Sequence, residues 1–227
     1  MKVIDYYNKL NDLFPFELAE SWDYSGLQIG DPQATVNNVL VTLDVTNAVV
    51  DEAINKNIDL IIAHHPPIFE DLKQITQPKL LKLIGNKIAV ISAHTNFDRV
   101  AMGEAFAKKY ELNSQKKDYL TIAEIDDEKL NKIIKDYPSK LINPKKSVKK
   151  IAIVLGSAAE FYEDAIAQGA DAFITGDIKY HDALDIKDSD LFTIDIGHHA
   201  EHEFFTKIIK EKIGGEVSKV NTYPFEK

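Results

Sequence analysis

Residues 39–65 read VLVTLDVTNAVVDEAINKNIDLIIAHH, residues 151–177 read IAIVLGSAAEFYEDAIAQGADAFITGD, and the pattern that they share decides the fold. Each stretch begins with a short apolar run, continues with the apolar spacing of an amphipathic helix, and ends in a second apolar run. The two stretches align at an offset of 112 residues, which is 151 − 39. The sequence therefore predicts two β-α-β units, one in each half of the chain.

The crossover helix of such a unit makes its two strands parallel, and strands this continuously apolar are usually covered on both faces. A third apolar run follows in each half, and a histidine comes directly after it, His94 in the first half and His198 in the second. The offset is then 104 (198 − 94), because the second half has a shorter loop. We expect an α/β fold with two similar halves, and either duplication or the general likeness of β-α-β units explains the repeat.

The remaining segments predict smaller elements. Between the halves, residues 113–149 contain a candidate strand at residues 119–125 and a candidate helix at residues 127–137. The last predicted element is a helix at about residues 200–213, which would end at Gly214 and Gly215.

Composition limits the class of protein. The 227 residues are 44% hydrophobic, which is enough to bury one large core or two small ones. No apolar run approaches the roughly 18 residues that span a bilayer, and the first residues lack the pattern of a secretory signal. We therefore expect a globular, cytoplasmic protein with no membrane partner. The sequence has no cysteine, which excludes disulfides and sulfur-bound metals, so nitrogen and oxygen must hold any metal.

The net charge opposes nucleic-acid binding. It is formally −9 at pH 7, whereas counterion release favours proteins that bring positive charge to the phosphates. The lysine-rich segment at residues 145–150 could form a local basic patch, but so short a run is also typical of a solvated linker. We expect no nucleic-acid partner.

The seven histidines all follow a predicted strand or begin the next helix, at positions 64, 65, 94, 181, 198, 199 and 202. In open α/β sheets, this edge is where ligands bind. His64 and His65 precede Pro66 and Pro67, which end the ladder hydrogen bonds of the strand and fix the exit of the chain. Alternate residues of an extended segment point to opposite sides, so two neighbouring metal ions could take one ring each. The alternative is a polar loop dipeptide.

Two further segments contain candidate ligands. Asp98 lies four residues beyond His94, and its carboxylate could bridge two cations or cap a helix. His198 and Glu201 are three residues apart, so they share a face if Gly197 opens a helix. A polar first turn of a helix would give the same pattern. His94 itself could bind metal, transfer protons or orient a ligand. Together, the clusters favour a metal centre.

These motifs resemble those of the Nif-three-like dinuclear-metal family, whose members are often named GTP cyclohydrolase type-two homologues. The resemblance covers nearly the whole chain, and seven ordered motifs are more specific than any one of them. The motifs are residues 19–30 (AESWDYSGLQIG), 42–44 (TLD), 62–66 (IAHHP), 94–98 (HTNFD), 175–177 (TGD), His181 and residues 197–198 (GH).

The resemblance implies a dinuclear metal site, a toroidal homohexamer and two interleaved three-layer α/β domains with mixed or parallel sheets, related by a pseudo-two-fold repeat. The implied domains are residues 1–115 with 198–227, which carry most of the ligands, and residues 116–197. The implied ligands are His64, His65, Asp98, His198 and a downstream glutamate.

Two departures from the family pattern affect the site. The family spaces the last histidine and glutamate by three or four residues, which here selects Glu201 or His202. We choose Glu201, because a bridging carboxylate suits two cations better than a third terminal imidazole. Tyr24 replaces the asparagine that usually follows Trp-Asp, and this puts substrate contacts, rather than metal ligands, in doubt.

We therefore expect two divalent metal ions per chain, of zinc, iron, manganese, cobalt or nickel. Open metal positions hold water, so the first hypothesis is a metal-dependent hydrolase that acts on a nucleotide or a similar small molecule. His94 and His181 are the candidate proton-transfer residues, with Glu20 as a third. The alternative is a non-catalytic hexamer that binds or delivers metal. A DNA-encircling ring is disfavoured by the acidic charge.

Overall fold

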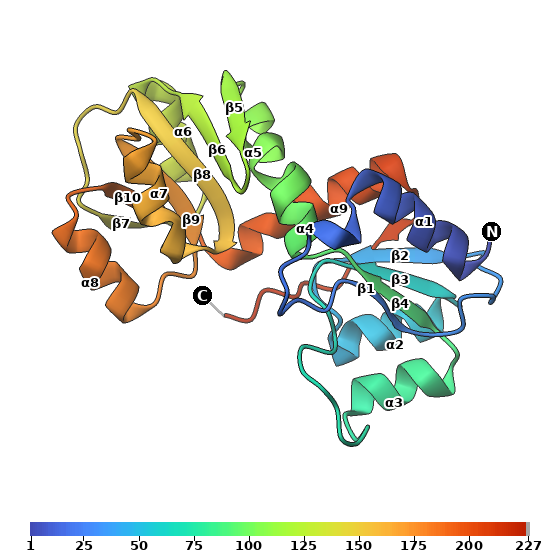
Figure 1. The fold of residues 1–227 in the computed structure, drawn as a ribbon. Coiled ribbons are helices and arrows are strands. Elements are labelled where there is room, and N and C mark those ends of the chain that lie inside the picture. The colour runs from blue at the N-terminus through green and yellow to red at the C-terminus, as the bar shows by residue number, and fades with distance from the viewer. Residues whose placement is uncertain (226–227) are drawn as a thin grey trace. The chain divides into compact units, whose positions relative to one another are not determined.

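The computed structural model describes residues 1–225. These residues contain two β-sheets (Figure 1). These residues form two compact units, the first from Met1–Phe97 together with the chain from Phe205 onward, and the second from Asp98–Phe204. The chain thus leaves the first unit and returns to it, which confirms the interleaved organisation. The predicted domain limits, residues 1–115 with 198–227 and residues 116–197, stay a prediction, because compactness alone defines these units.

The first unit contains a sheet in the order β1-β4-β3-β2-β11, parallel except for β1. Its strands are β1 (Gly26–Ile29), β2 (Val39–Thr42), β3 (Leu60–Ala63), β4 (Ala89–Ser92) and β11 (Glu216–Val217). Its helical elements are α1 (Val3–Leu13), η1 (Phe16–Leu18), α2 (Asn47–Asn55), α3 (Pro78–Gly85), α4 (Thr95–Phe97) and most of α9 (Glu201–Lys212).

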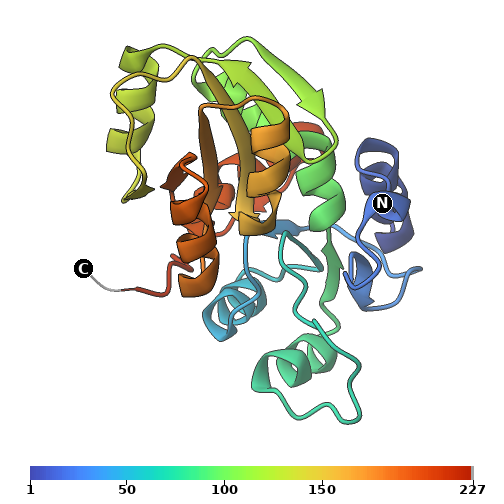
Figure 2. The same ribbon diagram turned by 60° about the vertical axis from the view of Figure 1, so that its left-hand side comes forward.

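Helices cover both faces of this first sheet. Figures 1 and 2 show α2 and α3 side by side on one face, and Figure 1 shows α1 and α9 on the other. The apolar stripe of α2 includes Val50, and that of α3 includes Leu83; both pack with Ile61 of β3 in one buried cluster. On the opposite face, the ring of Phe97 lies 5.0 Å from that of Phe205. This arrangement is the predicted three-layer α/β fold.

The second unit contains a sheet in the order β5-β6-β8-β9-β10-β7, in which β8, β9 and β10 are parallel and the flanking pairs antiparallel. Its strands are β5 (Ser114–Lys117), β6 (Leu120–Glu124), β7 (Lys140–Ile142), β8 (Lys150–Ser157), β9 (Ala172–Gly176) and β10 (Phe192–Asp195). Its helical elements are η2 (Asp98–Met102), α5 (Gly103–Lys109), α6 (Asp127–Asp136), η3 (Ala159–Phe161), α7 (Tyr162–Ala167), α8 (Tyr180–Asp188) and η4 (His198–Ala200).

Helices also cover both faces of the second sheet. Ala165 of α7 packs in a buried cluster with Ile122 and Phe173. Successive strand residues point to opposite faces, so Thr121 faces away from that cluster. There it meets Gly103 of α5, where an added Cβ would clash with the Thr121 hydroxyl. The second unit is therefore three-layered as well.

The predicted repeat is present in the pairing of the strands. β2, β3 and β4 pair in that order, as do β8, β9 and β10. Val39 lies opposite Leu60, and Ile151 lies opposite Ala172, so both strands keep the predicted offset of 112 (151 − 39 and 172 − 60). The first two strands of each half were therefore aligned correctly at their starts, whereas a register shift between Ile153 and Ser157 interrupts the pairing of β8 with β9 before the strands end.

The third strand corrects the predicted alignment by one residue. The matching pairs are Ala63 with Ser92 and Thr175 with Asp195, which gives an offset of 103 (195 − 92). Backbone pairing sets the register, so Gly197 takes the place of His94. The prediction that His198 occupies this place, at an offset of 104, was wrong.

A carboxylate fixes the start of the first parallel strand in both units. Asp59 accepts hydrogen bonds from two backbone N–H groups that precede β2, and Asp171 accepts them from the residue before β8 and from the first residue of β8. The donors are Asn37 (2.8 Å) and Asn38 (3.0 Å) for Asp59, and Lys149 and Lys150 (both 3.0 Å) for Asp171. Each of these positions differs from its counterpart by 112 residues. Duplication would produce such a contact at the same offset, whereas the general likeness of β-α-β units does not require it.

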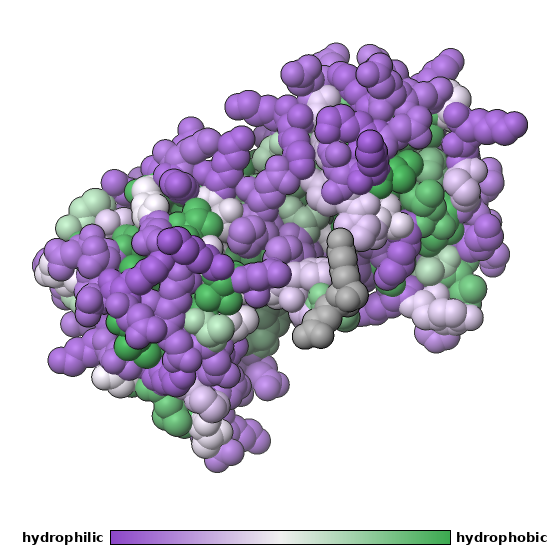
Figure 3. All heavy atoms as spheres, turned by 180° about the vertical axis from the view of Figure 1, so that it is seen from behind, coloured by the Kyte–Doolittle hydropathy of each residue, from purple (hydrophilic) through white to green (hydrophobic). Residues whose placement is uncertain are grey.

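The surface agrees with a core that is covered on both sides. Hydrophilic side chains occupy most of the face in Figure 3, and hydrophobic ones gather there in small, separate areas. Within residues 1–225, no helix is long and apolar enough to cross a membrane.

Candidate metal centre

Three histidine rings meet at the carboxyl edge of the first sheet. His64 and His65 directly follow β3, and His94 comes two residues after β4. Each ring can offer one nitrogen, and the three nitrogens lie within 4.8 Å of one another. His64 is fully buried, whereas His65 and His94 are partly exposed. The structure thus brings together three of the predicted site residues, with one ring in the interior and two nearer the solvent.

Backbone pairing positions this edge. The N–H of His64 donates to the carbonyl oxygen of Thr42 (3.2 Å), and that of His65 donates to Leu43 (3.0 Å), so the parallel pairing of β2 and β3 continues past the strand ends. Pro66 then follows and cannot extend the ladder. The two rings therefore stand on a backbone that is fixed by the sheet.

An oxygen atom holds Nδ1 of each ring. Nδ1 of His64 donates to the carbonyl oxygen of Ala93 at 2.9 Å, and Nδ1 of His65 lies 2.6 Å from a carboxylate oxygen of Asp44. His94 makes the same kind of contact, with Asp23, at 3.0 Å. These oxygens accept hydrogen bonds, so the ring proton lies on Nδ1 and Nε2 is the atom that would bind a metal.

This arrangement is typical of metal-binding histidines, which donate the other ring N–H to a carboxylate or a backbone carbonyl. Neutral imidazoles that offer Nε2 suit zinc and the neighbouring divalent transition metals. The donor set of the first unit therefore fits a metal of the predicted kind.

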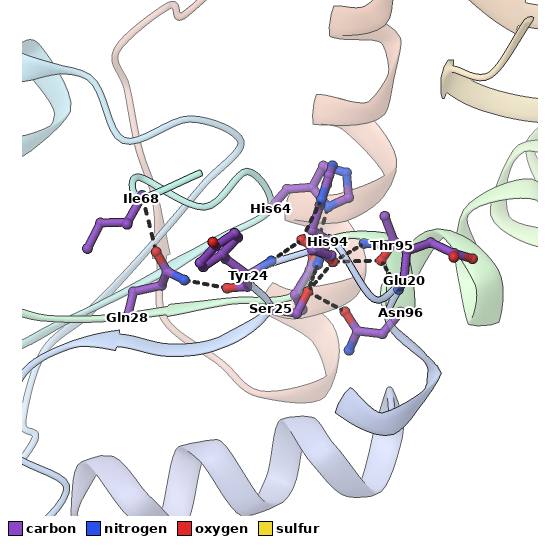
Figure 4. A network of polar contacts seen from close by, with 11 residues as sticks. Glu20, Tyr24, Ser25, Gln28, His64, Ile68, His94, Thr95 and Asn96 are labelled. Carbon is purple, nitrogen blue, oxygen red and sulfur yellow. Dashed lines mark hydrogen bonds and ion pairs between the residues drawn. The ribbon is translucent and has the colours of Figure 1, made fainter. Parts of the chain in front are cut away.

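Asp23 is the centre of a hydrogen-bond network that orients His94. Figure 4 labels His94 and the network residues Ser25 and Thr95. The Asp23 carboxylate also accepts from the hydroxyl of Ser25 (2.7 Å) and from the N–H and hydroxyl of Thr95 (3.1 and 2.6 Å). Burial raises the pKa of Asp23, but the hydrogen bond and charge of His94, with the bonds from Thr95 and Ser25, outweigh burial and hold this pKa well below its ordinary value. Asp23 is therefore ionised at neutral pH.

Sequence analysis did not identify Asp23 and Asp44 as groups that orient the histidines. These contacts join residues 71 and 21 positions apart, so only the folded chain reveals them. The sequence signal that could have identified Asp23 and Asp44 was their place in the Trp-Asp and Thr-Leu-Asp motifs.

The other predicted ligands lie in the second unit. Nε2 of His198 is 3.3 Å from a carboxylate oxygen of Glu201, and its Nδ1 is 3.5 Å from Asp177. His198–Ala200 is a 3-10 turn, in which residues i and i+3 eclipse, so the predicted shared face of His198 and Glu201 is present. Gly197 opens this turn with a φ of 80°.

Gly156 makes room for the buried Glu201 side chain. Glu201 is only 2% exposed, and a Cβ added to Gly156 would lie 2.5 Å from its Oε1. Gly156 also has a φ of +82°, which disfavours other residues. A glycine at the end of β8 therefore permits this position of the carboxylate.

Asp98 lies within a continuous helical run rather than at its start. α4 precedes it, and Asp98 begins the π-helical segment η2, which leads into α5. The alternative of a helix N-cap is therefore not the conformation found. Single π-helical turns are frequent at functional sites, which agrees with a role for Asp98.

The remaining histidines have other environments. His181 is exposed in the first turn of α8, with its ring 5.5 Å from that of Tyr180, and its role in proton transfer stays a prediction. The rings of His199 and His202 stack at 5.2 Å with an angle of 8°. The backbone N–H of Glu20 donates to Thr95 (3.0 Å), beside the Asp23 network.

Comparison with known proteins agrees over the full length of the chain. A family model described as Duf34/NIF3 (NGG1p interacting factor 3) matches residues 1–226. A "GTP cyclohydrolase 1 type 2 homolog" of Clostridium perfringens is 34% identical, over 100% of this chain and 99% of the relative. Another, of Clostridium acetobutylicum, is 31% identical, over 97% of this chain and 92% of the relative. The crystal structure of Staphylococcus aureus protein SA1388 has a TM-score of 0.86 and 29% identity, over 100% of this chain and 99% of that one.

Proposed function

The chain belongs to the Duf34/NIF3 family, and from this premise we propose that it binds two divalent metal ions and uses them to hydrolyse a nucleotide or a similar small molecule. One observation carries the proposal: His64 and His65 lie together, and an oxygen holds Nδ1 of each. Histidines held in this way present Nε2 to a metal.

His64 and His65 are the proposed ligands of the first unit. Ala93 and Asp44 fix the orientation of their rings, and the sheet fixes their backbone. The ring centroids of His64 and His65 lie 4.8 Å apart, and we propose that each ring serves one of two neighbouring ions. In the second unit, the further proposed ligands are Asp98, His198 and Glu201, which rest on the sequence motifs and the family resemblance.

Bound divalent ions supply a water ligand of lowered pKa and polarise a phosphoryl or carbonyl oxygen of the substrate. The protein supplies orientation and proton transfer. We assign proton transfer to His94 at Nε2, because the ionised Asp23 fixes the other ring nitrogen and leaves Nε2 available.

The proposal of a nucleotide substrate is based on the names of related proteins. Proteins that are 31% and 34% identical to this chain carry the name "GTP cyclohydrolase 1 type 2 homolog". We extend that name to this chain only as a class of reaction, hydrolysis at a nucleotide. A homohexamer is part of the same proposal, and light scattering of the purified chain tests it separately.

The experiment that tests the proposal is metal analysis by plasma mass spectrometry, followed by a hydrolysis screen with nucleoside triphosphates. We expect close to two equivalents in the wild type and a loss of metal in His64→Ala. The matched control is His181→Ala, which removes an exposed histidine that is not a proposed ligand.

Three outcomes decide between the hypotheses. Metal together with turnover supports the hydrolase. Metal without any turnover overturns the hydrolase and leaves the alternative, a protein that binds or delivers metal. No metal in the wild type, even after reconstitution with zinc, manganese and ferrous iron, refutes both.

A further inference from the structure

Two large aromatic side chains stand exposed beside His94. Trp22 is 55% exposed and Phe69 is 50% exposed. Their ring centroids are 6.2 Å apart with an angle of 33° between the planes. Both rings meet the ring of His94 nearly edge-on, at 6.1 Å for Trp22 and 5.5 Å for Phe69. Two large apolar surfaces thus face solvent next to the three clustered histidines.

Polar contacts hold the two aromatic residues in place. The hydroxyl of Tyr24 donates to Asp71 (3.0 Å), which ties the segment of Trp22 to the loop of Phe69. The side chain of Gln28 makes a second tie, since it donates to the carbonyl oxygen of Tyr24 and accepts from the N–H of Ile68 at 3.1 Å (Figure 4). The exposed pair is therefore built into the fold at a fixed place.

We propose that Trp22 and Phe69 form a stacking site for the planar heteroaromatic ring of the substrate, next to His94 and the metal-binding histidines. This inference rests on the proposed function, and it names the substrate group that the site recognises. Aromatic side chains stack on the faces of base rings, and every base offers such a face. The edge of His94 adds a polar group beside the bound ring.

The spacing of the two rings suits such a ligand. A ring held between two others needs roughly 7 Å, which is twice the optimal separation of about 3.5 Å between carbon atoms. The observed distance of 6.2 Å requires an opening of about 1 Å. The Phe69 side chain is 50% exposed, so rotation of this side chain can provide the opening while Ile68 and Leu72 keep their packing against the core.

A second copy of the chain fits this surface less well. An aromatic side chain buries about 150–250 Å² in total, so two half-exposed ones offer roughly 200 Å². A stable protein interface buries about 800 Å² on each partner. The pair is the right size for a single flat ring and too small for a subunit contact of its own.

The test uses the fluorescence of Trp22, which is the only tryptophan in the sequence. Guanosine is the probe, and ribose is the control without a ring. We expect guanosine to quench the emission of the metal-loaded wild type, whereas ribose leaves it unchanged. In Phe69→Ala, the Kd for guanosine should rise by about 5-fold to 150-fold, the range typical of one lost stacking contact.

The matched control is Leu81→Ala, which removes a similarly exposed apolar side chain from α3 in the same unit. It should leave the Kd for guanosine unchanged. Trp22→Ala lacks the fluorescent group, so calorimetry measures its affinity, and we expect a loss of the same size. Circular dichroism and metal content, measured on each variant, should match the wild type.

The outcomes separate this inference from the proposed function. If the wild type holds metal but guanosine does not quench, or if Phe69→Ala keeps the wild-type Kd, the stacking site is refuted and the metal centre stands. If quenching depends on Phe69 but no metal binds, the stacking site stands and the metal proposal fails. If Phe69→Ala instead changes the mass of the particle in light scattering, the pair is a contact between copies and the stacking site is refuted.

Discussion

Replacement of Asp44 by asparagine tests how the histidines are held. The carboxylate of Asp44 lies 2.6 Å from Nδ1 of His65 and makes the ring a stronger donor through Nε2. In Asp44→Asn, the amide oxygen can still accept from Nδ1, but without charge. If the amide NH₂ faces the ring instead, the ring proton moves to Nε2 and blocks the metal. Both orientations weaken metal binding.

The exposure of His65 and Asp44 determines how large a loss of metal affinity we expect. Loss of a partner that orients a metal-binding histidine typically costs about 10-fold to 100-fold in metal affinity. The side chains of His65 and Asp44 are 18% and 31% exposed, so water screens part of their interaction. We therefore expect the lower end of that range, a roughly 10-fold rise in Kd, which corresponds to about 1.4 kcal/mol.

The assay is a zinc titration at pH 7 in competition with a chromophoric chelator. The matched control is Asp51→Asn, since Asp51 is a half-exposed carboxylate of the same unit that pairs with Lys82 on the surface. Its Kd for zinc should equal that of the wild type. A Kd within twofold of the wild type for Asp44→Asn would refute the reasoning, and so would an equal loss in both variants.

Two other predictions concern the second unit and the Asp23 network. Gly156 and Gly214 both have positive φ, but among the described residues only Gly156 would place a Cβ against Glu201, so Gly156→Ala should lose about 1–3 kcal/mol more in urea unfolding than Gly214→Ala. Equal losses would contradict the buried position of the carboxylate. The pKa of Asp23 is lower in the folded chain than in the unfolded chain, so its contribution to stability is complete above about pH 4 and is lost as the pH falls further. Asp23→Asn should flatten the acid side of the curve of unfolding free energy against pH, and an unchanged acid slope would argue against the network.

Sequence analysis predicted the elements whose pattern is strong. β2, β3, β8 and β9 are continuously apolar and almost fully buried, and all were predicted. The candidate strand at residues 119–125 is β6, and the helix at residues 127–137 is α6. β5 and β7 were missed, because they lie at sheet edges, are mostly exposed and carry no apolar pattern.

The candidate site was predictable only where a motif follows a strand. His64, His65 and His94 were found because each comes just after a buried strand. Their partners Asp23 and Asp44 were missed as orienting groups, because these contacts depend on how the chain folds back rather than on local pattern. Trp22 and Phe69 were missed because apolar side chains are expected to be buried, and the sequence does not show that these two lie exposed beside one another.

The register of the repeat also shows how the two halves have diverged. The first unit carries His64 and His94 just beyond the carboxyl ends of two parallel strands. The counterparts, at offsets of 112 and 103, are Gly176 and Gly197. Duplication followed by divergence gives this pattern, in which two positions that hold imidazole rings in one copy hold no side chain in the other. A chain assembled from two copies of the second half would therefore keep the backbone but have no counterpart of these two rings.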